Sequence, residues 1–236
     1  YEEYNVAKDT HDKKRLQRLL VRLGKIKFFD PACGSGNFLI VSYKNIRQLE
    51  ILIWEELRKL GVPELPLSNI NLQQFYGIEI DDFACDTATL SLWLAEHQMN
   101  NKFQSVLGVH TEALPLRPSG HIVCGNACRI DWNMVCPHTA DEEVYVMGNP
   151  PYLGSKLQSK EQKEEVADVF KNVKNCKILD YIAIWFNLAS EFINGSKSKF
   201  AFVSTNSICQ GEQIAVLWPL ILSRNEEITF AYTSFK

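Results

Sequence analysis

The sequence has no long hydrophobic run, and this excludes one class of protein. No stretch of about 18 consecutive apolar residues occurs in the 236 residues, so we expect no membrane-spanning helix. The first residues, YEEYNVAKDTHDKKRLQRLL, are charged and contain no apolar core of the kind found in signal peptides. The sequence starts without Met and stops inside a strand-like run, ITFAYTSFK, so we expect it to be part of a longer polypeptide.

Paired cysteines are also missing. The seven cysteines include no C-x-x-C pair, which argues against a disulfide framework and favours a reducing cytoplasm. Cys124, Cys128, Cys136 and His138 form a conceivable zinc set, but their spacing fits no known zinc pattern, and Cys124 lies in a strand-like run. Buried thiols are the favoured interpretation, and we expect no metal.

The sequence also lacks an excess of basic residues. The net charge is −3 and the pI is about 6.0, whereas a dedicated nucleic-acid-binding domain is usually basic. Composition alone therefore gives no support to DNA binding by this part of the polypeptide.

The order of the expected elements indicates one α/β domain over residues 1–236, with a leading helix within 1–25. Apolar runs typical of buried strands occur at 26–30, 75–80, 121–127, 144–149, 199–206 and 227–235, and helical patterns separate most of them. This alternation predicts a mostly parallel sheet with helices on both faces. Such sheets bind ligands at the carboxyl ends of their strands.

The first strand ends in DPACGSGNF, where Gly34 and Gly36 allow a tight turn into a helix. The turn has no Gly-Lys-Ser/Thr ending, which argues against a P-loop, and Leu39 stands where a dinucleotide site needs its third glycine. S-adenosylmethionine (SAM) is the remaining ligand, and Asp30 can accept a hydrogen bond from its ammonium group. A turn without a ligand stays open as an alternative.

The next two strands also end in polar residues. Glu79 can accept hydrogen bonds from ribose hydroxyls, and Ile80 can pack on an adenine face. Asn126 follows the third strand, and its carboxamide offers a donor and an acceptor to the adenine edge. A helix-capping acid and a turn asparagine are the alternative interpretations.

The fourth strand ends in GNPPY. Asn149, Pro150 and Pro151 form a stiff segment, because proline fixes its own φ and restricts the residue before it. The Asn149 side-chain oxygen and the Pro150 carbonyl can together bind both hydrogens of a planar NH₂ group. Tyr152 supplies a ring on which a flat substrate can stack.

With DPACGSGNF, YGIEID and GNPPY in this order, the chain resembles the N6-adenine DNA methyltransferases. It looks most similar to the methyltransferase region of single-chain type IIG/IIL restriction–modification enzymes, through GNPPYLGSKLQSKEQKEE and FVSTNSICQGEQIAVLWP. The resemblance implies a Rossmann-like class I methyltransferase fold whose last strand lies beyond Lys236. It implies that SAM is bound by Asp30, Ala32, Cys33, Gly34, Gly36, Asn37, Glu79, Ile80 and Asn126, with Asn149, Pro150 and Tyr152 as catalytic residues and Tyr152 and Phe235 holding a flipped base.

The resemblance also implies a bacterial or archaeal cytoplasmic protein that acts on double-stranded DNA through a flanking recognition domain. Several alternatives stay open. Enzymes that methylate glutamine amides or RNA can use the same motif, and cytosine amino groups pose the same chemical problem. A SAM-binding module that is inactive in isolation is the alternative from another class.

Overall fold

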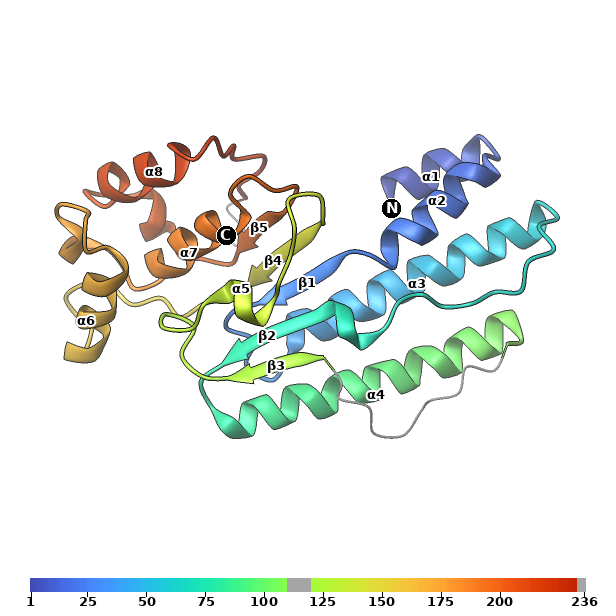
Figure 1. Ribbon diagram of the computed structural model, residues 1–236, viewed down its shortest axis with the longest axis horizontal. Coiled ribbons are helices and arrows are strands. Elements are labelled where there is room, and N and C mark those ends of the chain that lie inside the picture. Colours follow the sequence, from blue (N-terminus) through green and yellow to red (C-terminus); the bar gives the residue numbers. More distant parts are fainter. Residues whose placement is uncertain (110–119, 233–236) are drawn as a thin grey trace.

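The computed structural model describes residues 1–109 and 120–232, and within them a five-stranded sheet forms the centre of the molecule (Figure 1). The strand order is β3-β2-β1-β4-β5, and every neighbouring pair is parallel. The strands are β1 (Lys27–Asp30), β2 (Phe75–Glu79), β3 (His121–Cys124), β4 (Val144–Gly148) and β5 (Lys199–Phe202). The expected parallel α/β sheet is thus confirmed.

Helices cover both faces of this sheet. The α-helices are α1 (Glu2–Asp9), α2 (Lys13–Leu23), α3 (Asn37–Lys59), α4 (Asp82–Leu107), α5 (Trp132–Val135), α6 (Lys160–Val169), α7 (Ala183–Ile193) and α8 (Ile214–Leu222). The 3-10 helices are η1 (Leu72–Gln74), η2 (Cys176–Ile178) and η3 (Asn206–Cys209). None of the helices in the described residues combines the length and apolar character needed to cross a bilayer.

Two hydrophobic clusters occupy the two faces. Successive side chains of a strand point to opposite faces, so Phe28 and Phe29 enter different clusters. Phe28 packs with residues of α1 to α4, and its ring stacks on Phe75 at 5.1 Å. Phe29 packs with residues of α5 to α8, including an edge contact to Trp132 at 5.3 Å. Strands buried on both sides explain the continuous apolar runs in the sequence.

The amino-terminal region differs from the single leading helix expected within residues 1–25. It contains two helices, and the chain turns between them at His11, which has a φ of 52°. Asp12 begins the second helix by accepting a hydrogen bond from the Arg15 amide at 2.9 Å. An aspartate cap of this kind satisfies an amide that the helix itself leaves free, so it starts a new helix at that point.

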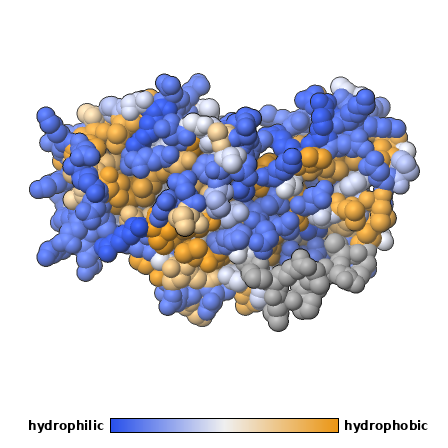
Figure 2. Space-filling view, viewed as in Figure 1, coloured by the Kyte–Doolittle hydropathy of each residue, from blue (hydrophilic) through white to orange (hydrophobic). Residues whose placement is uncertain are grey.

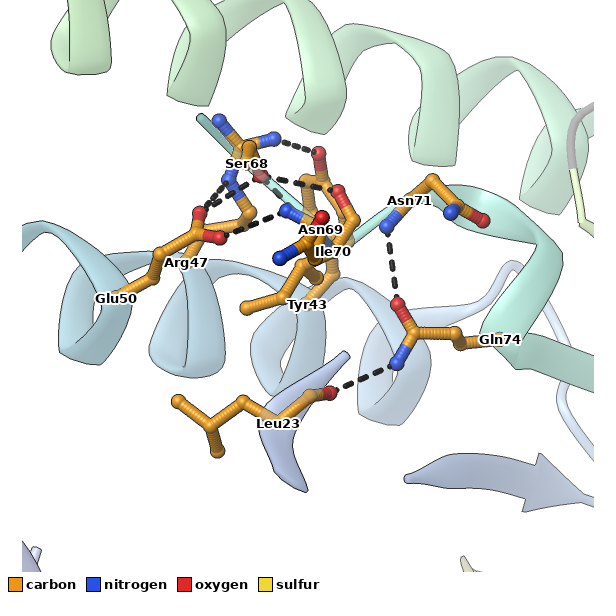
Figure 3. Close-up of polar contacts among 9 residues, drawn as sticks. All are labelled: Leu23, Tyr43, Arg47, Glu50, Ser68, Asn69, Ile70, Asn71 and Gln74. Atoms are coloured by element: carbon orange, nitrogen blue, oxygen red, sulfur yellow. Dashed lines mark hydrogen bonds and ion pairs between the residues drawn. The ribbon is translucent and has the colours of Figure 1, made fainter. Parts of the chain in front are cut away.

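The segment between α3 and β2 is held by buried polar groups (Figure 3). Arg47 and Glu50 are both 2% exposed and form an ion pair at 3.1 Å, and Arg47 also donates to the Tyr43 hydroxyl at 2.9 Å. Glu50 accepts from the Ser68 hydroxyl at 2.7 Å and from the Asn69 amide at 3.2 Å. This network fixes the chain before β2, at the opposite end of the sheet from the carboxyl ends of the strands.

The expected sixth strand, residues 227–235, is wrong over its described part. Residues 227–232 form no strand, and residues 233–235 lie outside the described residues. Ile228, Phe230 and Tyr232 alternate along the sequence as in a strand, but all three side chains are exposed. Alternation shows which side chains can share a face, whereas a strand also needs a hydrogen-bonded neighbour.

Candidate active site

The glycine turn after β1 is built for close packing. Gly34 and Gly36 have φ values of 53° and 84°, a region that glycine enters without the steric cost of a side chain. A Cβ added to Gly36 would lie 3.1 Å from the Cβ of Ala88, so the glycine lets the start of α3 approach α4. Asn37 begins α3 and is exposed, and Ala32 is half-buried.

Cys33 contributes to this turn through its backbone. Its amide donates to the Ile78 carbonyl at 3.0 Å, which fixes the turn against β2. Its side chain is buried beneath Gly77, where an added Cβ would lie 2.9 Å from the sulfur. Burial raises the pKa of this thiol, and the nearby charges of Asp30 and Glu79 raise it further. The thiol therefore packs inside the protein, against Gly77.

Glu79 at the end of β2 lies directly against the glycine turn. The Gly34 amide donates to Glu79 Oε2 at 2.7 Å. The amides of Ile80 and Asp81 donate to Glu79 Oε1 at 2.9 and 3.1 Å, at the start of α4. The structure thus brings together two features that the sequence placed on separate strands. Ile80 is 68% exposed, which leaves its side chain free to pack on a flat ring.

Asp30 connects the turn to β4. Its side chain is 1% exposed, Oδ1 accepts a hydrogen bond from the Ala32 amide at 3.1 Å, and Oδ2 has no partner in the described residues. Burial and the charge of Glu79 raise the pKa of this carboxyl to about 7, although the Ala32 hydrogen bond acts in the opposite direction. A Cβ on Gly148 would lie 2.5 Å from Asp30 Oδ1, so the residue before Asn149 touches the carboxylate.

The GNPPY segment continues from β4 at this edge. Asn149 is exposed, and no hydrogen bond is formed by its carboxamide within residues 1–109 and 120–232. Pro150 is buried, and the Tyr152 ring is 51% exposed. The Val203 amide donates to the Gly148 carbonyl at 2.9 Å, which holds the ends of β4 and β5 together. The Asn149 carboxamide is therefore free to bind a ligand, and it follows Gly148, which is held between β5 and the Asp30 carboxylate.

The chain after Tyr152 is held by Gln158, which sequence reasoning missed. Gln158 is buried, and its Nε2 donates to the carbonyls of Leu153 and Leu179 at 3.2 and 3.0 Å. The Tyr181 amide donates to the same Leu153 carbonyl at 2.9 Å. The only sequence signal nearby is the Ser159–Gln162 capping box that begins α6, and it does not identify the Gln158 contacts.

Asn126 lies one strand away from Glu79, because the Gly125 amide donates to the Glu79 carbonyl at 2.7 Å. Its carboxamide is held from inside the protein. Oδ1 accepts from the Cys128 amide at 2.8 Å, and Nδ2 donates to Glu165 at 2.6 Å. The remaining capacity of the carboxamide is one N–H and one lone pair.

Hydrophobic side chains are exposed around this end of the sheet and the first turns of α4 (Figure 2). Phe83 in the first turn of α4 is 80% exposed, and Ile80 just before this helix is also exposed. Phe235, the second expected base-stacking residue, lies outside the described residues.

The conceivable zinc set does not come together. The Cys124 thiol donates to Asp82 Oδ1 at 2.6 Å, while the Cys128 sulfur lies 3.7 Å from the Tyr181 hydroxyl. Cys136 is fully buried. No group of three or more histidine, cysteine or acidic side chains in the described part of the chain is arranged to hold a metal ion.

A parallel sheet in the order 3-2-1-4-5, with a glycine turn, an acid and an asparagine-proline segment at one edge, is a Rossmann-like methyltransferase fold. The model of the family described as "MmeI, DNA-methyltransferase domain" matches residues 6–236, and the chain belongs to this family. This confirms the predicted resemblance to the methyltransferase region of type IIL restriction–modification enzymes.

Three relatives give the extent of the similarity. The chain is 52% identical over 226 residues to DNA methyltransferase A of Bacillus subtilis (strain 168), a match that covers 95% of this chain and 26% of the relative. It is 39% identical over 89 residues to a putative type II restriction enzyme and methyltransferase of Methanocaldococcus jannaschii, covering 38% of this chain and 8% of that protein. The solved structure of the type IIL restriction–modification enzyme MmeI in complex with DNA matches with a TM-score of 0.82 and 38% identity, covering 94% of this chain and 30% of that one. The chain thus spans about a quarter to a third of the B. subtilis relative and of MmeI.

Proposed function

We propose that this chain transfers a methyl group from SAM to the N6 amino group of a flipped-out adenine in DNA, as the methyltransferase part of a restriction–modification enzyme. The observation that carries the proposal is the contact between Asp30 and Gly148. That contact follows from the parallel pairing of β1 with β4, which puts the glycine turn and Asn149 at neighbouring strand ends, as a cofactor and a substrate that react with each other require.

The residues around the turn fit the proposed cofactor. The unpartnered Oδ2 of Asp30 is a buried acceptor of the kind that an ammonium group satisfies. Glu79 already accepts three backbone amides and keeps one acceptor position for a ribose hydroxyl. Ile80 can cover the adenine face, and the carboxamide of Asn126 can meet the adenine edge. When bound, SAM supplies an electrophilic methyl group on a sulfonium centre.

Asn149 and Pro150 would orient the amine. The Asn149 side-chain oxygen and the Pro150 carbonyl accept the two amino hydrogens, which favours a pyramidal nitrogen with its lone pair free for attack. No strong base is needed beforehand, because the nitrogen loses its proton after it has become cationic. Positioning and polarisation would therefore provide most of the catalysis.

DNA is the substrate that the relatives support, since one is named a DNA methyltransferase and the MmeI structure contains DNA. A base inside a duplex is out of reach, and flipping it costs a few kcal/mol. Stacking on the half-exposed Tyr152 ring returns about 1–3 kcal/mol. The net charge of −3 fits a protein whose phosphate contacts are made largely by a flanking recognition domain. The proposed function belongs to the cytoplasm of a bacterium or archaeon.

The proposal is tested by incubating the full-length protein with tritiated SAM and DNA and then analysing the nucleosides. We expect the label in N6-methyldeoxyadenosine. Label in N4-methyldeoxycytidine would contradict the adenine assignment, and label in protein or RNA alone would contradict the DNA assignment. Binding of SAM without transfer to any of these would favour a binding module.

A further inference from the structure

Glu165 of α6 is a buried carboxylate next to the candidate cofactor site. It is 6% exposed, and three side chains direct donors at it, two from the segment after β3 and one from the segment before α7. Asn126 Nδ2 donates at 2.6 Å, the Tyr181 hydroxyl donates at 2.5 Å, and Arg129 forms an ion pair with it at 3.2 Å. Hydrogen bonds to a charged group are stronger than neutral ones, so this carboxylate is a firm anchor for Asn126.

The same cluster reaches two other strand ends. Tyr181 donates its hydroxyl to Glu165 and its backbone amide to the Leu153 carbonyl, behind the GNPPY segment. Its ring packs edge-on against Trp185 at 5.4 Å. The Trp185 indole N–H donates to the Pro31 carbonyl at 3.1 Å, in the glycine turn. Glu165 therefore belongs to a network that touches the ends of β1, β3 and β4.

Only one orientation of the Asn126 carboxamide satisfies the hydrogen bonds of this network. Its oxygen faces a donor, the Cys128 amide, and its nitrogen faces an acceptor, Glu165. Rotation of the carboxamide by 180° would place a donor against the Cys128 amide and an acceptor against the carboxylate, and both hydrogen bonds would be lost.

We propose that Glu165 is a positioning residue that fixes the orientation of the Asn126 carboxamide and so makes the cofactor site selective for adenine over hypoxanthine. This role rests on the proposed function. Adenine presents an amino donor beside the N1 acceptor, whereas hypoxanthine presents an oxygen acceptor beside an N1–H donor. A carboxamide held in one orientation matches only one of these patterns, and a carboxamide free to rotate can match either.

The test measures the dissociation constants of S-adenosylhomocysteine and S-inosylhomocysteine by calorimetry with the full-length protein. We expect wild type to prefer the adenine compound, and Glu165→Ala to reduce this preference about tenfold. Glu165→Gln keeps an oxygen for Asn126, while the Tyr181 hydroxyl can turn to accept from the new amide, so most of the preference returns. Glu164→Gln is the matched control, since Glu164 is exposed on the same helix and its one ion pair among the described residues is with Lys160 at 3.9 Å.

A double-mutant cycle separates positioning from general destabilisation. In an Asn126→Ala background, Glu165→Ala should leave the ratio of the two dissociation constants unchanged, because the group that it orients is gone. Glu165→Leu is a second variant that removes the acceptors and fills the space, in case the alanine variant does not fold. Thermal melting checks that each variant is folded.

Three results would overturn this role: equal affinity of wild type for the two compounds, an unchanged preference in both Glu165→Ala and Glu165→Leu, or a further change in the Asn126→Ala background. A wild type that binds neither compound would overturn the proposed function itself, and the role of Glu165 with it.

Discussion

Replacing the buried carboxyl of Asp30 by a carboxamide is expected to stabilise the protein without cofactor, and more strongly at pH 8 than at pH 5. Burial and the charge of Glu79 raise the pKa of Asp30 from 3.8 to about 7. A carboxyl whose pKa is raised by folding does not destabilise the folded protein at pH values below its pKa in the unfolded chain. The loss of folding free energy grows as the pH rises from the unfolded-state pKa to the folded-state pKa, and it is constant above the folded-state pKa.

The size of the effect follows from that interval. About three pKa units correspond to about 4 kcal/mol at about 1.4 kcal/mol per unit, and this full penalty applies at pH 8. At pH 5 the pH lies only a little over one unit above the unfolded-state pKa, so the free-energy penalty is roughly 1.5–2 kcal/mol. The stability of Asp30→Asn relative to wild type should therefore rise by about 2–3 kcal/mol from pH 5 to pH 8.

Urea unfolding at the two pH values measures this difference directly. Glu142→Gln is a control of opposite sign, because the hydrogen bond from Lys27 lowers the pKa of Glu142, so its loss destabilises the protein at both pH values. With SAM present the order should reverse, since Asp30→Asn removes the partner proposed for the ammonium group. A stability difference between Asp30→Asn and wild type that is the same at pH 5 and pH 8 would show that the buried Asp30 carboxyl does not titrate between these pH values.

Two further predictions concern packing around the site and remote from it. Gly36→Ala should lower the free energy of unfolding by about 2–4 kcal/mol, from its positive φ and the 3.1 Å contact with Ala88. Gly61 has a φ of 75° and open space around it, so Gly61→Ala should lower the free energy of unfolding only through the strained backbone, by about 1–2 kcal/mol. Equal losses for the two variants in urea unfolding would contradict a packing role for Gly36. Glu50→Leu should cost about 3–5 kcal/mol because it leaves Arg47 buried and unpaired. The double variant with Arg47→Leu should recover much of this loss, and no recovery in urea unfolding would mean that the pair itself stabilises the fold.

The glycine turn, Glu79 and the GNPPY segment could be predicted from the sequence for one reason. In a parallel sheet the carboxyl ends of the strands meet at one edge, so residues that directly follow strands lie close together wherever they stand in the chain. The contact of Glu79 with the Gly34 amide is an instance of this rule. The strand order itself was not predicted, because the alternation of strands and helices does not specify it.

Glu165, Tyr181 and Gln158 could not be found in this way. Glu165 lies in helix α6, Tyr181 just before α7 and Gln158 in a loop. Their roles depend on contacts across the fold, such as the hydrogen bond between Asn126 and Glu165, which are 39 positions apart in the sequence. Residues 155–177 are rich in charged and polar side chains, yet they also supply the buried Glu165 and Val166 of α6. One buried acid among several exposed ones has no periodic signature of its own.

The proposed role of Asn149 and Pro150, to hold the target amine beside the methyl donor, is tested by the kinetics of Asn149→Ala. Methyl transfer to DNA at saturating SAM should fall by about 100-fold or more, while the dissociation constant of SAM changes by less than about threefold. Asn101→Ala, which removes an exposed carboxamide near the far end of α4, should leave both quantities unchanged. Weakened SAM binding by Asn149→Ala, with the rate of transfer at saturation preserved, would contradict the catalytic role of Asn149.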